Sequence, residues 1–144
     1  MPTTAHYLAL DPGETTGWAS FNTDGTPKDF GQVKGRIEVY TLLQEVQPKV
    51  LIVEDFMLFP WKSKDQAFSS FEAVRVIGAV EFWAWAKKSV FVLQKPNVKD
   101  IGYMWAGVSK AKSHKDSHQL DAYVHGVYFL QKTGILKPQQ LGGR

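Results

Sequence analysis

Residues 50–54, Val50-Leu51-Ile52-Val53-Glu54, place four apolar residues in a row before a carboxylate. A strand with one face in water alternates apolar and polar residues, so this unbroken run predicts a strand that is covered on both faces. The segment before it, Arg36–Val46, has apolar residues at helical spacing and is followed by Pro48, which predicts a helix that ends there. A buried strand after a helix favours a parallel central strand in a mixed α/β sheet.

The rest of the chain alternates predicted strands and helices around this strand. Further strands are expected at 7–11, 18–21, 30–33 and 90–93. The first three form an antiparallel meander, with a turn at Asp24-Gly25. Helices are expected at 69–88, at 96–103 with Pro96 as the first residue, and at 117–132, and loops at 56–65 and 109–115. The sequence therefore predicts one α/β domain over residues 1–136, a five-stranded mixed sheet flanked by helices, with a flexible tail at 137–144.

Composition narrows the class of protein. The chain has 144 residues, a net charge of +3 and no cysteine. Without cysteine, disulfide scaffolds, thiolate zinc sites and cysteine nucleophiles are excluded, so any metal must be held by oxygen and imidazole. The N-terminus has no basic region of a signal peptide, and the most apolar stretch, 76–86, is too short to span a bilayer. We therefore expect a cytoplasmic protein with no membrane partner.

Two carboxylates are expected at one edge of the sheet. Asp11 ends the strand at 7–11, Glu54 ends the strand at 50–54, and neighbouring strands lie about 4.8 Å apart. Carboxylates this close repel each other unless a cation lies between them, and open α/β sheets bind ligands at this edge. Each residue also has a plain structural interpretation, a turn at Asp11 and a solvated strand end at Glu54, which the residues alone leave open.

The last predicted helix adds Asp121 and His118, which are three residues apart and so share one helical face. An Asp, Glu, Asp and His set suits Mg²⁺ or Mn²⁺ better than Zn²⁺. The alternatives are a solvated first-turn residue for His118 and a dipole-favoured acid for Asp121. Asp116 is predicted to cap the helix together with Gln119, and His125 to be a core or supporting residue rather than a ligand.

Three segments that carry these residues resemble, in order and spacing, the catalytic motifs of RuvC-type Holliday junction resolvases, a ribonuclease H-like family. They are residues 8–19 (Leu-Ala-Leu-Asp-Pro-Gly-Glu-Thr-Thr-Gly-Trp-Ala), 51–54 (Leu-Ile-Val-Glu) and 117–122 (Ser-His-Gln-Leu-Asp-Ala). The resemblance extends over most of the chain, residues 7–131. It implies a ribonuclease H-like fold and Asp11, Glu54 and Asp121 as ligands, with His118 where relatives carry histidine or aspartate. Lys99 falls where the family has a basic residue and is a candidate for stabilising phosphate charge.

The same resemblance implies a homodimeric endonuclease of DNA recombination and repair that uses two divalent metal ions, Mg²⁺ or Mn²⁺. Such an enzyme resolves four-way junctions by paired symmetric nicks that leave 5′-phosphate and 3′-hydroxyl ends. The loop around residues 59–62, Phe-Pro-Trp-Lys, matches no family pattern, and the chain is shorter than typical cellular members. These departures suggest a phage-encoded or divergent branch that acts in the host cytoplasm.

Basic and aromatic residues are expected to form a DNA-binding rim around the acidic centre. The candidates are Phe56, Phe59, Trp61, Lys62, Lys64, Lys95, Lys110, Lys112 and Lys115. The aromatic residues fit stacking on bases at a branch point and fit buried loop anchors equally well. The long helix also has a second apolar face, for which the alternatives are a second copy of the chain and burial within one monomer; it consists of Phe71, Val74, Gly78, Phe82 and Trp85.

There are three alternatives to the resolvase. An actin-like or sugar-kinase ATPase needs two domains around its nucleotide, and a chain of 144 residues with one acidic loop cannot form them, so no nucleotide cofactor is expected. A non-catalytic DNA-binding module is disfavoured because every acidic position is filled. The alternative that remains is a ribonuclease H-like nuclease acting on forks, flaps or RNA-containing substrates.

Overall fold

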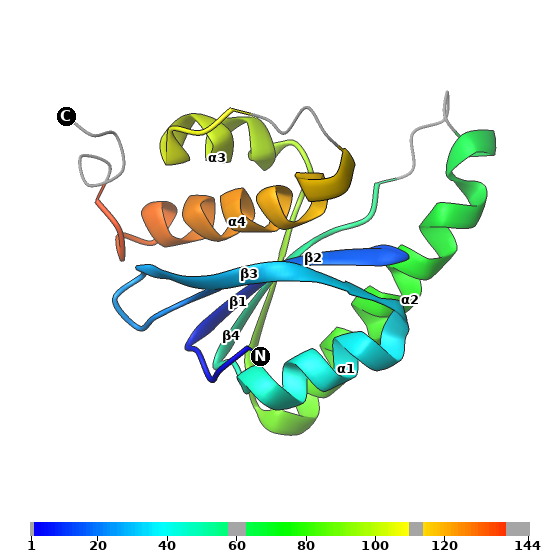
Figure 1. Cartoon of the computed structure of the whole chain (residues 1–144), viewed down its shortest axis with the longest axis horizontal. Helices are drawn as coiled ribbons and strands as arrows, with labels where there is room; N and C mark the ends of the chain where they lie inside the picture. The colour runs from blue at the N-terminus through cyan, green and yellow to red at the C-terminus, as the bar shows by residue number, and fades with distance from the viewer. Residues whose placement is uncertain (1, 58–62, 110–113, 138–144) are drawn as a thin grey trace.

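The computed structural model describes residues 2–57, 63–109 and 114–137, with the backbone alone at 63–70 and 114–116. Its five strands are β1 (Tyr7–Asp11), β2 (Thr15–Phe21), β3 (Pro27–Lys34), β4 (Val50–Glu54) and β5 (Val90–Gln94). They form one sheet in the order β3-β2-β1-β4-β5 (Figure 1). β1, β2 and β3 pair antiparallel in sequence, whereas β4 pairs parallel with both β1 and β5. The predicted meander and the predicted parallel central strand are both confirmed.

Helices cover both faces of the sheet (Figure 1). α1 (Gly35–Val46) and α2 (Ser63–Lys87) lie on one face, and α3 (Val98–Ala106) and α4 (His114–Lys132) lie on the other. The apolar run of β4 is explained by this arrangement. Leu51 and Val53 belong to the core beneath α1 and α2, and Ile52 belongs to the core beneath α4. All three are fully buried, as expected of a strand covered on both faces. In the part of the chain that the structure describes, no helix combines the length and apolar character needed to cross a membrane.

Three helix starts differ from the prediction. α2 begins at Ser63 rather than at residue 69, because residues 63–68 contain no glycine or proline that would stop the helix from extending. α3 begins at Val98 with Asn97 as its N-cap, so Pro96 lies before the helix and is not its first residue. There the carbonyl of Pro96 accepts a hydrogen bond from the Lys99 N–H. α4 begins at His114, which places Asp116 inside the helix and makes its predicted capping role wrong.

Two glycines set how closely α4 approaches its neighbours. Gly17 in β2 pairs with Asp11 in β1, and a Cβ on Gly17 would lie 2.0 Å from the backbone carbonyl carbon and oxygen of His118. A Cβ on Gly102 in α3 would lie 2.5 Å from the carbonyl oxygen of Val124. No side chain fits at either place without backbone movement, so these glycines bring α4 against β2 and α3 against α4.

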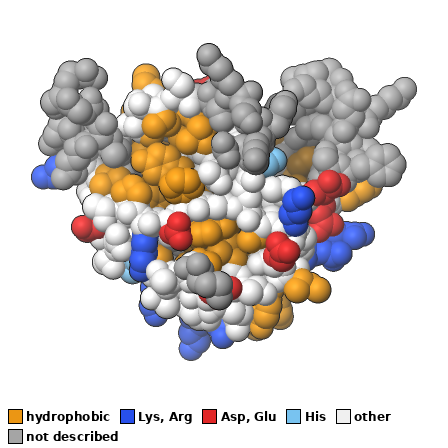
Figure 2. All heavy atoms as spheres, viewed as in Figure 1, with side chains coloured by type: hydrophobic (Ala, Val, Ile, Leu, Met, Phe, Trp, Pro, Cys, Tyr) orange, Lys and Arg blue, Asp and Glu red, His pale blue; other side chains and the backbone are white. Residues whose placement is uncertain are grey.

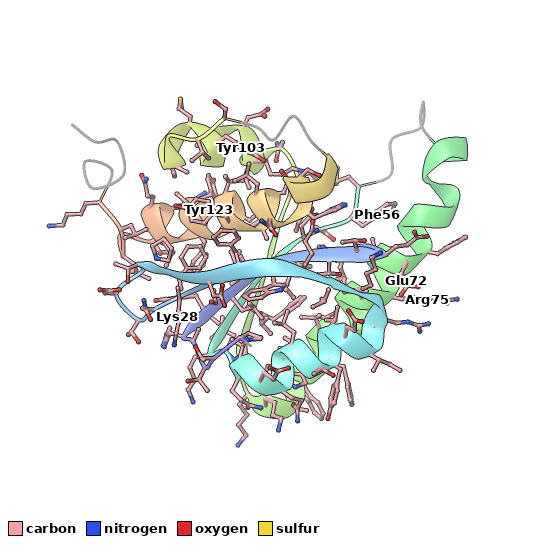
Figure 3. The ribbon with its side chains drawn as sticks, viewed as in Figure 1. Lys28, Phe56, Glu72, Arg75, Tyr103 and Tyr123 are labelled. Carbon is pink, nitrogen blue, oxygen red and sulfur yellow. The ribbon has the colours of Figure 1, made fainter. Side chains whose placement is uncertain are left out.

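α1 and α2 meet near the end of the sheet at which Asp11 lies. Arg36 at the start of α1 pairs with Glu72 of α2 at 3.2 Å. Figure 3 shows Glu72 and Arg75 close together on α2, and Figure 2 shows acidic and basic side chains gathered at this end of the visible face. The other side of α2 packs on the sheet, where Val76, Val80 and Trp83 are buried.

Candidate active site

Three carboxylates from three elements meet at the carboxyl edge of the parallel strands. Asp11 ends β1, Glu54 ends β4, and Asp121 lies in α4. One carboxylate oxygen of each residue lies within 4.8 Å of those of the other two. Asp11 is buried, and Glu54 and Asp121 are half-buried. The juxtaposition predicted from the strand ends and the helix face is therefore present.

A cleft of about 250 Å³ lies over this cluster. Its polar lining comes from Asp11, Glu54, Asp55 and Lys99. Phe56, from the segment after β4, and Ile77, from α2, contribute apolar lining. Two of the three carboxylates, Asp11 and Glu54, therefore line an opening that a ligand can enter, together with Lys99 and apolar residues.

Lys99 lies among the carboxylates. Its Nζ is 3.3 Å from Glu54 Oε1 and 3.3 Å from Asp121 Oδ2. Burial lowers the pKa of Lys99, but the charges of Glu54 and Asp121 outweigh this effect and the net pKa is raised. The ammonium group therefore stays charged and offsets part of the repulsion within the cluster.

His118 contacts the cluster from the first turns of α4. Its Nδ1 lies 3.1 Å from Asp11 Oδ2, and this hydrogen bond raises the pKa of His118 above its ordinary value. Among the described residues, the ligand atoms that lie within 4.8 Å of one another come from the three carboxylates and not from His118. Its contact with Asp11 agrees with a place in the site, and its role as a metal ligand stays a prediction.

The environments of Asp11 and Glu54 shift the pKa values of these two residues in opposite directions. Burial raises the pKa of Asp11 from 3.8 to about 6, and the hydrogen bond with His118 opposes this without cancelling it. Burial also raises the pKa of Glu54, but the hydrogen bond from His125 and the charge of Lys99 outweigh burial and leave it lowered. Glu54 is therefore held ionised, whereas Asp11 is charged at a greater cost.

These shifts predict that the metal-free protein loses stability as the pH rises from about 4 to 7. Folded Asp11, with a pKa of about 6, keeps a proton that the unfolded chain releases near 3.8. Its stabilising contribution is therefore complete below pH 3.8 and is lost as the pH passes 6. Two pKa units correspond to at most about 3 kcal/mol. The raised pKa of His118 acts in the same direction.

Urea unfolding in the presence of chelator, at pH 5 and pH 7, measures this effect. The Asp11→Asn variant is the control, because it cannot ionise at this position. We expect the difference in unfolding free energy between the two pH values to be smaller in the variant. An equal difference in both proteins would contradict the assignment of the effect to Asp11.

Three further residues support the carboxylates: two contact a carboxylate directly, and the third contacts one of those two. The hydroxyl of Tyr103 in α3 donates a hydrogen bond to Asp121 Oδ1 at 2.6 Å, and Figure 3 shows Tyr103 between α3 and α4. His125 Nε2 lies 3.0 Å from Glu54 Oε1, and its Nδ1 lies 2.7 Å from Gln94 Oε1. The predicted supporting role of His125 agrees with these contacts. Tyr103 and Gln94 were not predicted, although the position of Gln94 at a strand end, like that of Glu54, was a usable signal.

The predicted DNA-binding residues are only partly described. Phe56 is half-buried and lines the cleft, and Lys95 is exposed beside the end of β5. The other seven lie where the structure describes no side chains: Phe59, Trp61, Lys62, Lys64, Lys110, Lys112 and Lys115. Their role in binding DNA stays a prediction.

No protein-family model and no curated protein matches the sequence. The structure, however, is similar to that of RuvC from Thermus thermophilus solved with a Holliday junction substrate. The TM-score is 0.64 at 16% identity, over 90% of this chain and 96% of that one. It is also similar to the Fowlpox virus resolvase solved with Holliday junction DNA, with a TM-score of 0.61 at 14% identity, over 89% and 98% of the two chains. The chain therefore has the ribonuclease H-like fold of the RuvC-type resolvases.

Proposed function

We propose that the protein is a metal-dependent endonuclease that resolves four-way DNA junctions by paired symmetric nicks, leaving 5′-phosphate and 3′-hydroxyl ends. The observation that supports this most is the Asp11, Glu54 and Asp121 cluster at the open edge of the sheet. It occurs in a fold shared with two proteins that were solved with Holliday junction DNA.

The donor set of the cluster fits Mg²⁺ or Mn²⁺. Both ions prefer carboxylate oxygen, and the three residues offer oxygens within 4.8 Å of one another. Asp11, Glu54 and Asp121 would hold two such ions, with His118 beside Asp11. When bound, divalent ions lower the pKa of a water molecule and stabilise negative charge on phosphate oxygens.

The other residues of the site serve to place the DNA backbone. Lys99 brings a permanent positive charge to the cleft, where a scissile phosphate would approach the carboxylates. Phe56 and Ile77 give the cleft an apolar lining that can border a sugar or base next to that phosphate. Lys95 is exposed and directly precedes Pro96, which lines the cleft, and we expect it to contact a neighbouring phosphate.

We predict that Lys99→Met lowers the single-turnover cleavage rate of a four-way junction by about 10²-fold, as for the loss of one charged group that stabilises a transition state. The rate is measured at saturating Mg²⁺ and enzyme, so that weaker binding does not contribute. Lys99→Arg keeps the charge and should retain more activity. A rate for Lys99→Met within twofold of the wild type would show that Lys99 only neutralises the cluster.

A homodimer through α2 is the second part of the proposal. The predicted second apolar face is exposed in the monomer: the exposed fractions of Phe82 and Trp85 are 68% and 76%, and Phe71 and Val74 on the same face are also exposed. Burial within one monomer was therefore the wrong alternative. Because a four-way junction has two-fold symmetry, a dimer through this face would place two active sites on two strands.

We expect the double variant Phe82→Glu/Trp85→Glu to be monomeric, because it introduces two charges into the proposed interface. Analytical ultracentrifugation gives the mass of the wild type and the variant, and circular dichroism checks that the variant is folded. Replacing exposed Tyr40 on α1 with glutamate is the matched control and should leave the dimer intact. A monomeric wild type at the concentrations used for cleavage would rule this interface out.

The proposed reaction is tested with strand-labelled substrates on denaturing gels. The panel contains a four-way junction, a fork, a flap, an RNA–DNA duplex and linear DNA, each with Mg²⁺, Mn²⁺ or chelator. Paired nicks at symmetric positions of the junction, absent with chelator, are expected. Metal-dependent cutting of forks, flaps or the RNA–DNA duplex alone would keep the site and change the substrate, and no cutting of any substrate would overturn the proposal.

A further inference from the structure

A polar pair is buried in the otherwise apolar core beneath α4. His125 is completely buried and Gln94 is 8% exposed, yet the buried residues that α4 contributes to this core, Ala122, Val127 and Leu130, are apolar. Burying an imidazole and an amide is unfavourable unless each is hydrogen-bonded. The two side chains contact each other, with His125 Nδ1 at 2.7 Å from Gln94 Oε1. That contact alone gives no reason for placing a polar pair there.

The second ring nitrogen of His125 supplies the reason. Glu54 and Gln94 are direct partners in the parallel pair of β4 and β5, so their side chains leave the same face of the sheet. α4 crosses that face, and His125 lies one helical turn after Asp121. The imidazole therefore bridges the two strand ends, with Nε2 at 3.0 Å from Glu54 Oε1 and Nδ1 against Gln94.

The bridge restrains Glu54 through one of its carboxylate oxygens. Oε1 lies 3.0 Å from His125 Nε2 and 3.3 Å from Lys99 Nζ, and Oε2 lies 3.4 Å from the same Nζ. A glutamate side chain has three rotatable bonds, and holding it in one rotamer before a cation arrives removes that ordering cost from binding. An imidazole whose other nitrogen is tied to Gln94 cannot rotate away from Glu54.

We propose that His125 and Gln94 are positioning residues that hold Glu54 in its ligating orientation and thereby set the affinity of the carboxylate cluster for divalent cations. This inference rests on the metal site of the proposed function. Gln94 acts through His125, and His125 acts through Glu54. Outer hydrogen bonds of this kind change metal affinity by about 10- to 100-fold when they are removed.

The test is calorimetric titration of Mn²⁺ into the protein without DNA. His125→Leu removes both hydrogen bonds and is expected to weaken Mn²⁺ binding by about 10- to 100-fold. His125→Gln keeps an N–H donor near the place of Nε2 and is expected to recover much of the affinity. Gln94→Met, which keeps the size of the side chain and lets His125 rotate, is expected to give a smaller loss. It also tests the inference if His125→Leu does not fold.

A double-mutant cycle separates positioning from packing. Because Gln94 acts through His125, the double variant His125→Leu/Gln94→Met should bind Mn²⁺ no more weakly than His125→Leu alone. Leu130→Ala is the matched control: it truncates a completely buried side chain of the same helix and core, away from the cluster. It should lower the unfolding free energy and leave Mn²⁺ affinity of the folded protein unchanged.

Two results would overturn the inference. One is a folded His125→Leu protein that binds Mn²⁺ as the wild type does, and the other is an equal loss of affinity in Leu130→Ala. The wild type and Asp11→Asn, titrated in parallel, separate this failure from that of the proposed function. If the wild type does not bind Mn²⁺, the proposed metal site and the positioning role are both wrong. If Asp11→Asn loses Mn²⁺ binding but His125→Leu does not, the metal site is supported and the positioning role is wrong.

Discussion

Asp11→Asn is expected to lose cleavage of a four-way junction by about 10³-fold or more and still to bind the junction. Asp11 contacts His118 at 3.1 Å, and one of its carboxylate oxygens lies within 4.8 Å of oxygens of Glu54 and Asp121. An amide replaces the carboxylate at the same volume, so the fold has no reason to change. The cluster loses one ligand and one negative charge. The reacting phosphate then loses electrostatic stabilisation, which accounts for the expected fall in the cleavage rate.

Binding is expected to be equal or tighter, because the removed charge repels DNA phosphates. Single-turnover cleavage on denaturing gels gives the rate, and a mobility shift in Ca²⁺ or chelator gives junction affinity. Asp29→Asn, at an exposed aspartate of β3, is the matched control and should cleave normally. Cleavage by Asp11→Asn within tenfold of the wild-type rate would contradict the assignment of this carboxylate.

Gly17→Ala is expected to destabilise the protein by about 3 kcal/mol or more, the upper range for overpacking. The new Cβ would lie 2.0 Å from backbone atoms of His118, and ordinary contact begins at 3.4 Å, so α4 must move by about 1.4 Å. Neither partner can yield by rotating a side chain, because the clash is with the main chain of a helix. Moving α4 also carries His118 and Asp121 away from Asp11.

The variant should therefore lose cation affinity as well as stability. Urea unfolding in chelator measures the stability, and Mn²⁺ titration of the folded protein measures the cation affinity. Gly78→Ala is the control for stability: it makes the same substitution at a site of α2 with no atom of the chain within 4 Å of the new Cβ. Because Gly78 belongs to the proposed dimer face, this control is compared with its parent in the Phe82→Glu/Trp85→Glu background. It should leave the unfolding free energy equal or raise it by about 0.5–1 kcal/mol. A Gly17→Ala protein as stable as the wild type would show that α4 does not rest on β2 as described.

The strand ends of the site were predictable because they follow from local rules. The unalternating run before Glu54 identified a strand covered on both faces. The Pro-Gly turn directly after Asp11 identified Asp11 as the last residue of its strand. Since both strands are parallel neighbours, their carboxyl ends meet at one edge. Helical periodicity predicted that Asp121 shares a helix face with His118. The approach of Asp121 to Asp11, however, depends on Gly17, whose importance appears only when α4 is packed on β2.

Other features depended on tertiary packing and were not predictable in the same way. Tyr103 contacts Asp121 because Gly102 lets α3 approach α4 closely. No local sequence pattern near Tyr103 indicates this approach. The start of α3 was misplaced because proline favours the first turn of a helix, whereas Pro96 here serves as an acceptor in the preceding turn. The starts of α2 and α4 were also misplaced, because no glycine or proline lies between the observed start of either helix and the predicted one.

The most direct test of the metal centre is anomalous diffraction from crystals of the wild-type protein grown with Mn²⁺. The predicted result is one or two anomalous peaks in direct contact with carboxylate oxygens of Asp11, Glu54 and Asp121, absent in Asp11→Asn crystals grown in the same way. Well-ordered crystals with no peak between these carboxylates at millimolar Mn²⁺, or with Mn²⁺ bound only elsewhere, would contradict the account.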